Sequence, residues 1–190
     1  MRKIIFLIHV TLDGYVAGTN GEMDWIEYND EVAAHSEAFH AITDTAIYGR
    51  KTFEMMKGYW TTVSDNPNAD EYDKKHATWL QSASKIAVST TMQVDDWANI
   101  IIGDDLQDRF TALKQQDGKD MWLLGSPTLA QSMMRLNLID EYRILVNPVI
   151  LGSGQRLFAE MEHQLDLRLI EPKTFSGGVV LLCYVPDDDE

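Results

Sequence analysis

Two segments decide the expected fold: Ala46-Ile47-Tyr48-Gly49-Arg50-Lys51-Thr52 and Met121-Trp122-Leu123-Leu124-Gly125-Ser126-Pro127-Thr128. Each passes from an apolar run, typical of a buried strand, through a glycine into a helical pattern. A helix that begins directly after a strand points several unpaired backbone N–H groups at one place, and its dipole makes that place attractive to anions. Two such places in one small α/β domain predict a ligand with separated phosphates, and a dinucleotide fits that description.

The rest of the chain alternates between strand and helix patterns. We expect strands at residues 3–12, 46–48, 85–89, 99–102, 121–124 and 141–146, and helices at 30–45, 51–59, 71–82, 106–116 and 128–136. This alternation predicts an α/β fold with a mainly parallel sheet and helices on both faces. Two further runs, 165–175 and 179–185, are joined by Ser176-Gly177-Gly178 and predict an antiparallel hairpin at one edge. The polar stretch 61–72 is expected to run over the surface. Residues 1–186 are predicted to form a single domain, with 187–190 as a solvated acidic tail.

Bulk composition excludes several classes of function. The 190 residues carry a net charge of −14 at pH 7, which argues against nucleic acid because phosphate neutralisation needs clustered Lys and Arg. No run reaches the roughly 18 apolar residues of a membrane span, so no membrane partner is expected. Polar residues interrupt the first apolar run too early for a signal peptide, so we expect a cytoplasmic protein. The histidines show no metal-ligand spacing, and no metal site is predicted.

The first loop offers three groups to a phosphate. Gly49 lets the backbone turn tightly, Arg50 has a planar fork of donors, and Thr52 adds a hydroxyl at the start of the helix. An arginine at a helix N-terminus opposes the dipole by roughly 0.3–1 kcal/mol, and a bound anion would reverse that penalty.

The second loop allows two interpretations. Pro127 suits the first helical position, and Ser126 and Thr128 could either bind phosphate oxygens or simply cap the helix. Ser89 and Thr90 end another predicted strand, where they could contact the adenosine side of a nucleotide or remain in solvent.

Two loop acids are candidates for the proton that a reduction would need. Asp13 follows the first strand, where ligands of doubly wound sheets bind, although it could also be an ordinary turn residue. Asp24 could donate a proton, or it could be a solvated acid near a helix start. Water is the third alternative.

Four segments, in this order, resemble the dihydrofolate reductase superfamily, and especially the reductase domain of the bifunctional riboflavin-biosynthesis enzymes (RibD). They are Thr11-Leu12-Asp13-Gly14-Tyr15-Val16-Ala17, Gly49-Arg50-Lys51-Thr52, Gly125-Ser126 in place of Gly-Gly, and a stretch from Leu138-Ile139-Asp140-Glu141 to Leu157-Phe158. The resemblance runs from about residue 3 to residue 184. It implies a three-layer fold and NADPH as cofactor.

The resemblance also implies where the cofactor lies. Val16 and Ala17 would lie near the nicotinamide, and Ser89 and Thr90 near the adenosine ribose. The pyrophosphate would lie near Gly49, Arg50, Thr52, Gly125, Ser126, Thr128 and Leu129.

Two positions depart from the family pattern. Thr90 and Thr91 stand where an arginine for the 2′-phosphate is common, which leaves NADH as an alternative to NADPH. Ala33, with His35 and Ser36 beside it, falls near the position of the acid that binds folate in folate reductases.

We therefore expect an NAD(P)H-dependent reductase of a small heterocyclic, pterin- or pyrimidine-like substrate. It would resemble a 5-amino-6-(5-phosphoribosylamino)uracil reductase or a dihydrofolate reductase. The natural substrate is expected to be smaller and more polar than dihydrofolate. The rival hypothesis is a non-catalytic nucleotide-binding or regulatory module that kept the pocket and lost the chemistry. The apolar hairpin and the segment 138–158 predict a homodimer.

Overall fold

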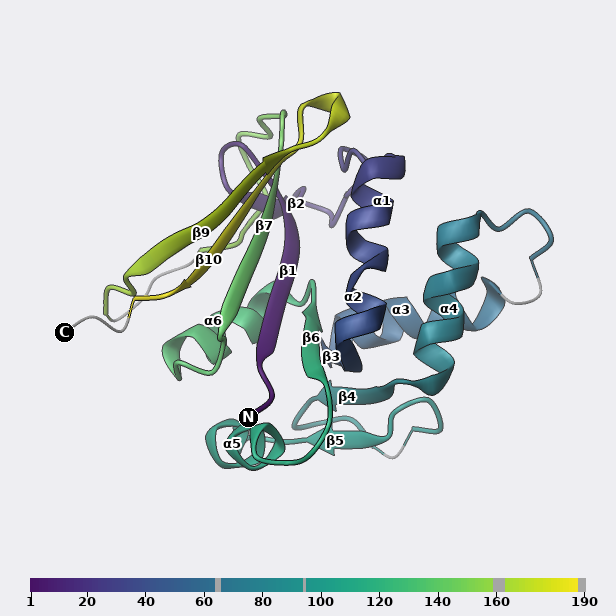
Figure 1. Cartoon of the computed structure of the whole chain (residues 1–190), viewed down its shortest axis with the longest axis vertical. Coiled ribbons are helices and arrows are strands. Elements are labelled where there is room, and N and C mark those ends of the chain that lie inside the picture. The colour runs from purple at the N-terminus through teal and green to yellow at the C-terminus, as the bar shows by residue number, and fades with distance from the viewer. Residues whose placement is uncertain (64–65, 94, 159–162, 188–190) are drawn as a thin grey trace.

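An eight-stranded sheet runs through the middle of the molecule, in the strand order β5-β4-β3-β6-β1-β7-β10-β9 (Figure 1). The computed structural model describes residues 1–63, 66–93, 95–158 and 163–187. The strands of this sheet are β1 (Ile4–Thr11), β3 (Thr43–Gly49), β4 (Ser84–Val88), β5 (Ile100–Ile102), β6 (Asp120–Leu124), β7 (Glu141–Asn147), β9 (Leu167–Thr174) and β10 (Val180–Pro186). A second sheet pairs β2 (Tyr15–Ala17) with β8 (Gln155–Arg156).

Helices cover both faces of the large sheet, because alternate strand residues point to opposite sides. Ile4 and Phe6 pack in a core with the helices α5 (Leu106–Lys114) and α6 (Pro127–Arg135). Ile5 and Leu7 pack in a second core on the other face. That face is covered by α1 (Asp30–Glu37), α2 (Phe39–Ile42), α3 (Arg50–Val63) and α4 (Glu71–Ser82). The predicted three-layer α/β architecture is confirmed.

The strand directions determine where a ligand can bind. The strands from β5 to β7 in the sheet order are parallel to one another. The predicted hairpin is also confirmed, since β10 pairs antiparallel with both β7 and β9 and Ser176–Gly178 forms its turn. The parallel strands bring their carboxyl ends, and therefore the loops after β1, β3 and β6, to one edge of the sheet.

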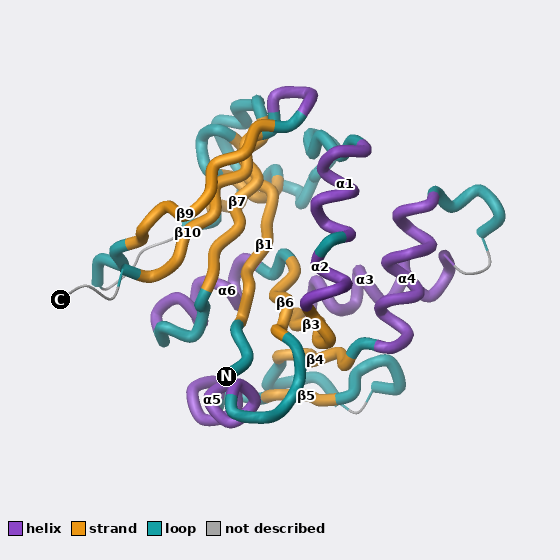
Figure 2. Tube along the Cα trace, in the orientation of Figure 1, coloured by secondary structure: helices purple, strands orange, loops and turns teal. Residues whose placement is uncertain are grey.

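The helix expected over residues 30–45 is two helices and the start of a strand, and the longer prediction is wrong. Figure 2 shows the break between α1 and α2 as a short loop. Thr43 and Thr45 belong to β3, where they pair with Asp120 and Met121 of β6. The helical spacing of Thr43 misled the prediction, because strand pairing with a distant segment overrides a local pattern.

The remaining differences are smaller. Helix α3 continues to Val63, beyond the predicted end at residue 59. The β2–β8 pair was not predicted. It depends on Gly154, because a Cβ atom at this position would lie 2.1 Å from the carbonyl oxygen of Ala17.

Residues 64–65 of the polar stretch and 188–190 of the acidic tail lie outside the described residues. Within the described part of the chain, no helix has both the length and the apolar character needed to cross a membrane.

Candidate active site

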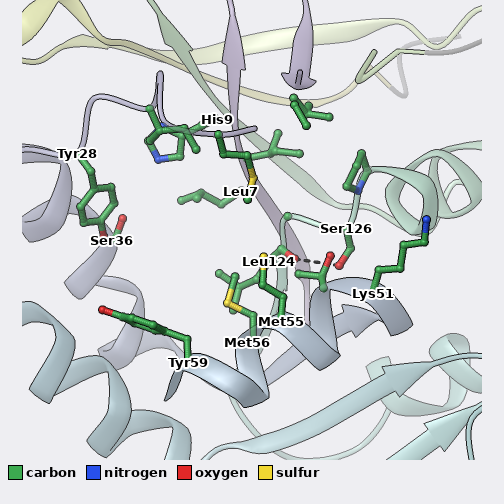
Figure 3. A pocket seen from close by; sticks show the side chains of 18 of the residues that line it. Leu7, His9, Tyr28, Ser36, Lys51, Met55, Met56, Tyr59, Leu124 and Ser126 are labelled. Carbon is green, nitrogen blue, oxygen red and sulfur yellow. Dashed lines mark hydrogen bonds between the residues drawn. The ribbon is translucent and has the colours of Figure 1, made fainter. Parts of the chain in front are cut away.

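A cavity of about 540 Å³ opens on the α1–α4 side of the sheet, where β1 and β6 end (Figure 3). One end of it is lined by residues of the two strand-to-helix junctions, which are Lys51 and Thr52 in the first turn of α3 and Gly125, Ser126 and Pro127 where β6 passes into α6. The opposite end is lined by hydroxyl-bearing and aromatic side chains, among them Tyr28, Ser36, Tyr59, Trp60, Tyr72 and His76. Leu7, Val16, Met55 and Met56 lie among the apolar residues of the walls. The cavity therefore joins a polar loop end to an aromatic end through an apolar middle.

The hydroxyl of Ser126 connects the two strand-to-helix junctions by hydrogen bonds. The backbone N–H of Gly49 donates a hydrogen bond to Ser126 Oγ at 2.9 Å, and this hydroxyl donates to the carbonyl oxygen of Leu124 at 3.0 Å. Ser126 is the N-cap residue of α6, but its side chain makes no capping hydrogen bond. The capping interpretation is therefore wrong for Ser126, and its hydroxyl leaves the first N–H groups of α6 to other partners.

Replacing Ser126 by alanine is expected to lower the free energy of unfolding by about 1–2 kcal/mol, because two hydrogen bonds of a buried hydroxyl are lost. Urea unfolding would measure the change. Ser126 has a φ of +55°, so Ser126→Gly loses the same bonds and relieves the left-handed backbone. The glycine variant should be the more stable of the two. An alanine variant as stable as the natural protein would show that the hydroxyl does not hold the loops.

The structure brings five of the predicted cofactor residues together at the cavity: Val16, Ala17, Thr52, Gly125 and Ser126. Gly49 lies directly behind them through its bond to Ser126. Thr128 is exposed on α6, and Leu129 is buried in the core beneath. Neither residue lines the cavity.

Three predicted cofactor residues lie apart from the cavity. Arg50 is the first residue of α3, with a side chain that is 45% exposed and pairs with Glu54 at 3.2 Å. Its neighbour Lys51, to which the sequence assigned no role, lines the cavity. Ser89 and Thr90 follow β4, and Ser89 Oγ accepts hydrogen bonds from backbone N–H groups of its own turn. Their roles stay predictions.

The geometry does not favour Asp13 as a proton donor. Its carboxylate accepts hydrogen bonds from Thr11 Oγ1 at 2.6 Å and from the backbone N–H groups of Leu151 and Gly152. The hydrogen bond from Thr11, followed by those from the backbone, lowers the pKa of Asp13. Asp13 thus ties the first loop to the segment after β7. Asp24 is exposed, and its neighbour Met23 lines the cavity while Asp24 does not.

The aromatic end of the cavity was not found from the sequence. Tyr28 comes from the loop before α1, Ser36 from α1, and Tyr72 from α4, and all three line the cavity. The hydroxyl of Tyr72 lies 3.5 Å from His76 Nδ1. The rings of Tyr28 and Tyr72 lie 5.3 Å apart. The spacing of Tyr72 and His76, one helical turn apart, was the available signal, but only the fold shows which loop and helix they face.

The histidines and tyrosines at this end of the cavity are uncharged near pH 7. Burial, together with the neighbouring His40, lowers the pKa of His76 to about 3. His76 Nδ1 lies 2.9 Å from His40 Nε2. Burial also lowers the pKa of His9 to about 4, although its hydrogen bond with Asn147 acts in the opposite direction. Burial raises the pKa of Tyr28 and of Tyr72. All four side chains are therefore neutral near pH 7.

Within the described chain, no group of three or more His, Cys, Asp or Glu side chains is placed to hold a metal ion. The cavity lies at the carboxyl edge of a mainly parallel sheet, and the fold is of the dihydrofolate-reductase-like class. A dihydrofolate reductase from Enterococcus faecalis, solved with NADP(H), superposes with a TM-score of 0.65 at 12% identity, covering 98% of this chain and 97% of that one.

The chain belongs to the RibD C-terminal domain family, whose model matches residues 2–181. It is similar to the uncharacterized protein YyaP of Bacillus subtilis (strain 168), with 34% identity over 96% of this chain and 94% of YyaP. It is also similar in structure to a protein from Shewanella sp. PV-4 described as a candidate riboflavin biosynthesis protein. That structure gives a TM-score of 0.77 at 22% identity, with 97% of this chain and 99% of that chain covered. Family membership supports a reductase-like role.

Proposed function

We propose that this protein is an NAD(P)H-dependent reductase of a small, planar, pterin- or pyrimidine-like heterocycle. The observation that carries the proposal is the cavity itself, which connects two strand-to-helix loops with an aromatic end. A dinucleotide and a small ring compound would need such a continuous space, because hydride transfer requires the two reacting rings to be in contact.

The residues at the loop end fit a dinucleotide. The first turn of α6 has no side-chain cap, and its N-terminus lies beside Gly125 and Thr52 at the cavity. Backbone N–H groups at such an end are suited to phosphate oxygens. A bound nicotinamide dinucleotide supplies a hydride. We propose NADPH, with NADH as the alternative, held by the loop residues and by Val16 and Ala17.

The other groups of the site would orient the rings and exclude water. The walls formed by Leu7, Met55 and Met56 are apolar, which keeps water away from the reacting atoms. Because the pKa of Asp13 is lowered, this acid holds no proton near pH 7. Asp24 and water remain the proposed proton sources.

Oxidation of NADPH and of NADH, followed by absorbance with a panel of pterin and pyrimidine acceptors, tests the proposal. Turnover of any acceptor above the rate without protein supports a reductase. Tight dinucleotide binding in calorimetry without turnover of any acceptor would favour a nucleotide-binding or regulatory module instead.

Arg50→Ala is expected to weaken NADPH binding about 10- to 100-fold, because a charge-assisted contact to phosphate is lost. Arg50 can leave Glu54 for a phosphate, since both side chains are about half exposed. Such a surface pair contributes little, so stability should hardly change. Glu54→Gln is the matched control and should bind NADPH at least as tightly. If titration calorimetry shows a loss with Lys51→Ala and none with Arg50→Ala, the anchor is Lys51.

We also propose that the protein is a homodimer. Strand β9 lies at the edge of the sheet with Leu169 and Ile170 nearly half exposed, and Ile150 and Phe158 are exposed as well. An unpaired apolar edge is suited to a second copy of itself. Ile170→Lys should give a monomer in light scattering, whereas Ile42→Lys, at an equally exposed isoleucine of α2, should not. A mass near 21.6 kDa for the natural protein at micromolar concentration would contradict the dimer.

A further inference from the structure

The described residues at the aromatic end of the cavity offer hydroxyl and indole donors to a ligand but no cation. Among the described residues that line the cavity, Lys51 is the one permanent cation, and it lies with Ser126 at the loop end (Figure 3). The one acid is Asp73 of α4, whose carboxylate accepts a hydrogen bond from the hydroxyl of Tyr59. The remaining titratable groups of this end are the neutral histidines and tyrosines described above. A phosphate or carboxylate placed there would have no cationic partner in the described part of the chain and would lie near the carboxylate of Asp73, which is unfavourable.

Three hydroxyl-bearing side chains, those of Tyr28, Ser36 and Tyr72, line the aromatic end of the cavity. Ser36 is the residue of α1 that lines the cavity, and Ala33 is not part of the lining. Ser36 is buried, and the hydroxyls of Tyr28 and Tyr72 lie close enough to it that, while burial raises the pKa of both tyrosines, the Ser36 hydroxyl acts to lower it. Hydroxyls both donate and accept, so this cluster can pair with a neutral edge that carries an N–H beside a carbonyl or a ring nitrogen. Unlike a carboxylate, it has no preference for a cation.

The surroundings of the hydroxyl cluster are suited to a flat ring. The side chains of Met56, Trp60 and Trp122 line the same end of the cavity. Aromatic and thioether side chains favour the faces of planar apolar groups. The ring faces of a ligand would therefore meet apolar atoms while one edge meets the hydroxyls.

We propose that Tyr28, Ser36 and Tyr72 determine the substrate class, and that the substrate is an uncharged planar ring compound without an anionic group at this end of the cavity. The proposal rests on the proposed reductase function. Reductases of phosphoribosylated pyrimidines act on a substrate that carries a phosphate, so the proposal gives this chain a different substrate class.

Binding of two fluorescent probes, pterin and pterin-6-carboxylate, tests the substrate class. The probes differ only in the carboxylate, and fluorescence anisotropy follows both in the absence and in the presence of saturating NADP⁺. The natural protein is expected to bind pterin about 10-fold more tightly, or better, because the described residues of this end of the cavity include no cation to pair with the carboxylate. Tyr28→Phe and Tyr72→Phe should each weaken pterin binding about 3- to 10-fold, the effect of one lost hydrogen bond.

Tyr184→Phe is the matched control, since Tyr184 lies on β10 outside the cavity, and it should bind pterin as the natural protein does. Thermal unfolding checks that each variant is folded. Equal affinity for the two probes, no binding of either probe, or unchanged binding by both tyrosine variants would overturn the proposal. Pterin binding with the expected preference but no binding of NADP⁺ or NADPH would count against the reductase function and leave this proposal standing.

Discussion

Dihydrofolate is expected to be at best a poor substrate, with kcat/KM below about 10⁴ M⁻¹s⁻¹. In folate reductases a buried acid pairs with the pterin ring, and loss of such a group typically costs about 10²–10⁴ in rate. In this chain the residue of α1 that faces the cavity is Ser36, and the acid Asp73 on α4 is bound by Tyr59. Steady-state kinetics with NADPH and dihydrofolate measures the expected deficit.

Ser36→Asp provides a control for this explanation. A carboxylate on α1 should raise kcat/KM for dihydrofolate above that of the natural protein, provided that the variant is folded. A kcat/KM of the natural protein for dihydrofolate at or above about 10⁴ M⁻¹s⁻¹ would contradict the prediction. A folate complex in which Asp13, Asp24 or Asp73 pairs with the pterin would contradict it as well. The apolar walls also revise one expectation: the substrate is expected to be smaller than dihydrofolate, but not more polar.

Lowering the pH from 7 to 5 is expected to destabilise the fold by about 2 kcal/mol for each of His9 and His76. The folded-state pKa values, about 4 and about 3, lie below the value of 6.5 that both residues have when exposed. The unfolded chain therefore binds more protons below pH 6.5. The stabilisation is complete above that pH and is lost as the pH falls towards the folded-state values.

Urea unfolding at several pH values tests this dependence. His76→Phe should reduce the loss between pH 7 and pH 5 by about 2 kcal/mol, because His76 no longer titrates while His9 and His35, whose pKa values are also lowered, still do. A phenyl ring suits the surrounding aromatic side chains. His163→Phe, at an exposed histidine, should keep the full pH dependence. Equal slopes in the natural protein and in His76→Phe would show that His76 is not held neutral by burial.

Much of the fold was predictable because local signals agreed with the final structure. The apolar runs at residues 121–124 and 141–146 form central strands. Gly49 at the end of β3 and Gly125 after β6 mark the change to helix. The hairpin signal Ser176-Gly177-Gly178 also lies where the turn forms, with Gly177 at a φ of +77°. Backbone requirements of this kind are local, and so the sequence alone reveals them.

The boundary between α2 and β3 was not predictable in the same way. Thr43 fits a helical spacing as well as a strand, and the partner strand β6 lies more than 70 residues away. Arg2 adds a hydrogen bond to Thr45 Oγ1 at 2.6 Å. These contacts form only after the sheet assembles, and their energy exceeds the weak helical preference of the segment.

The sequence by itself determined the class of fold, the two loops and the edge of the sheet on which they meet. The order of strands and helices and the glycines carry that information locally. Only the tertiary structure decided which side chains line the cavity and what they contact. In it Ser126 accepts a hydrogen bond from Gly49, and Asp13 accepts hydrogen bonds from Leu151 and Gly152. Tyr28, Ser36 and Tyr72 come together from a loop and two helices. The physical reason is that hydrogen bonding and burial depend on neighbours in space, which no local pattern in a single chain specifies.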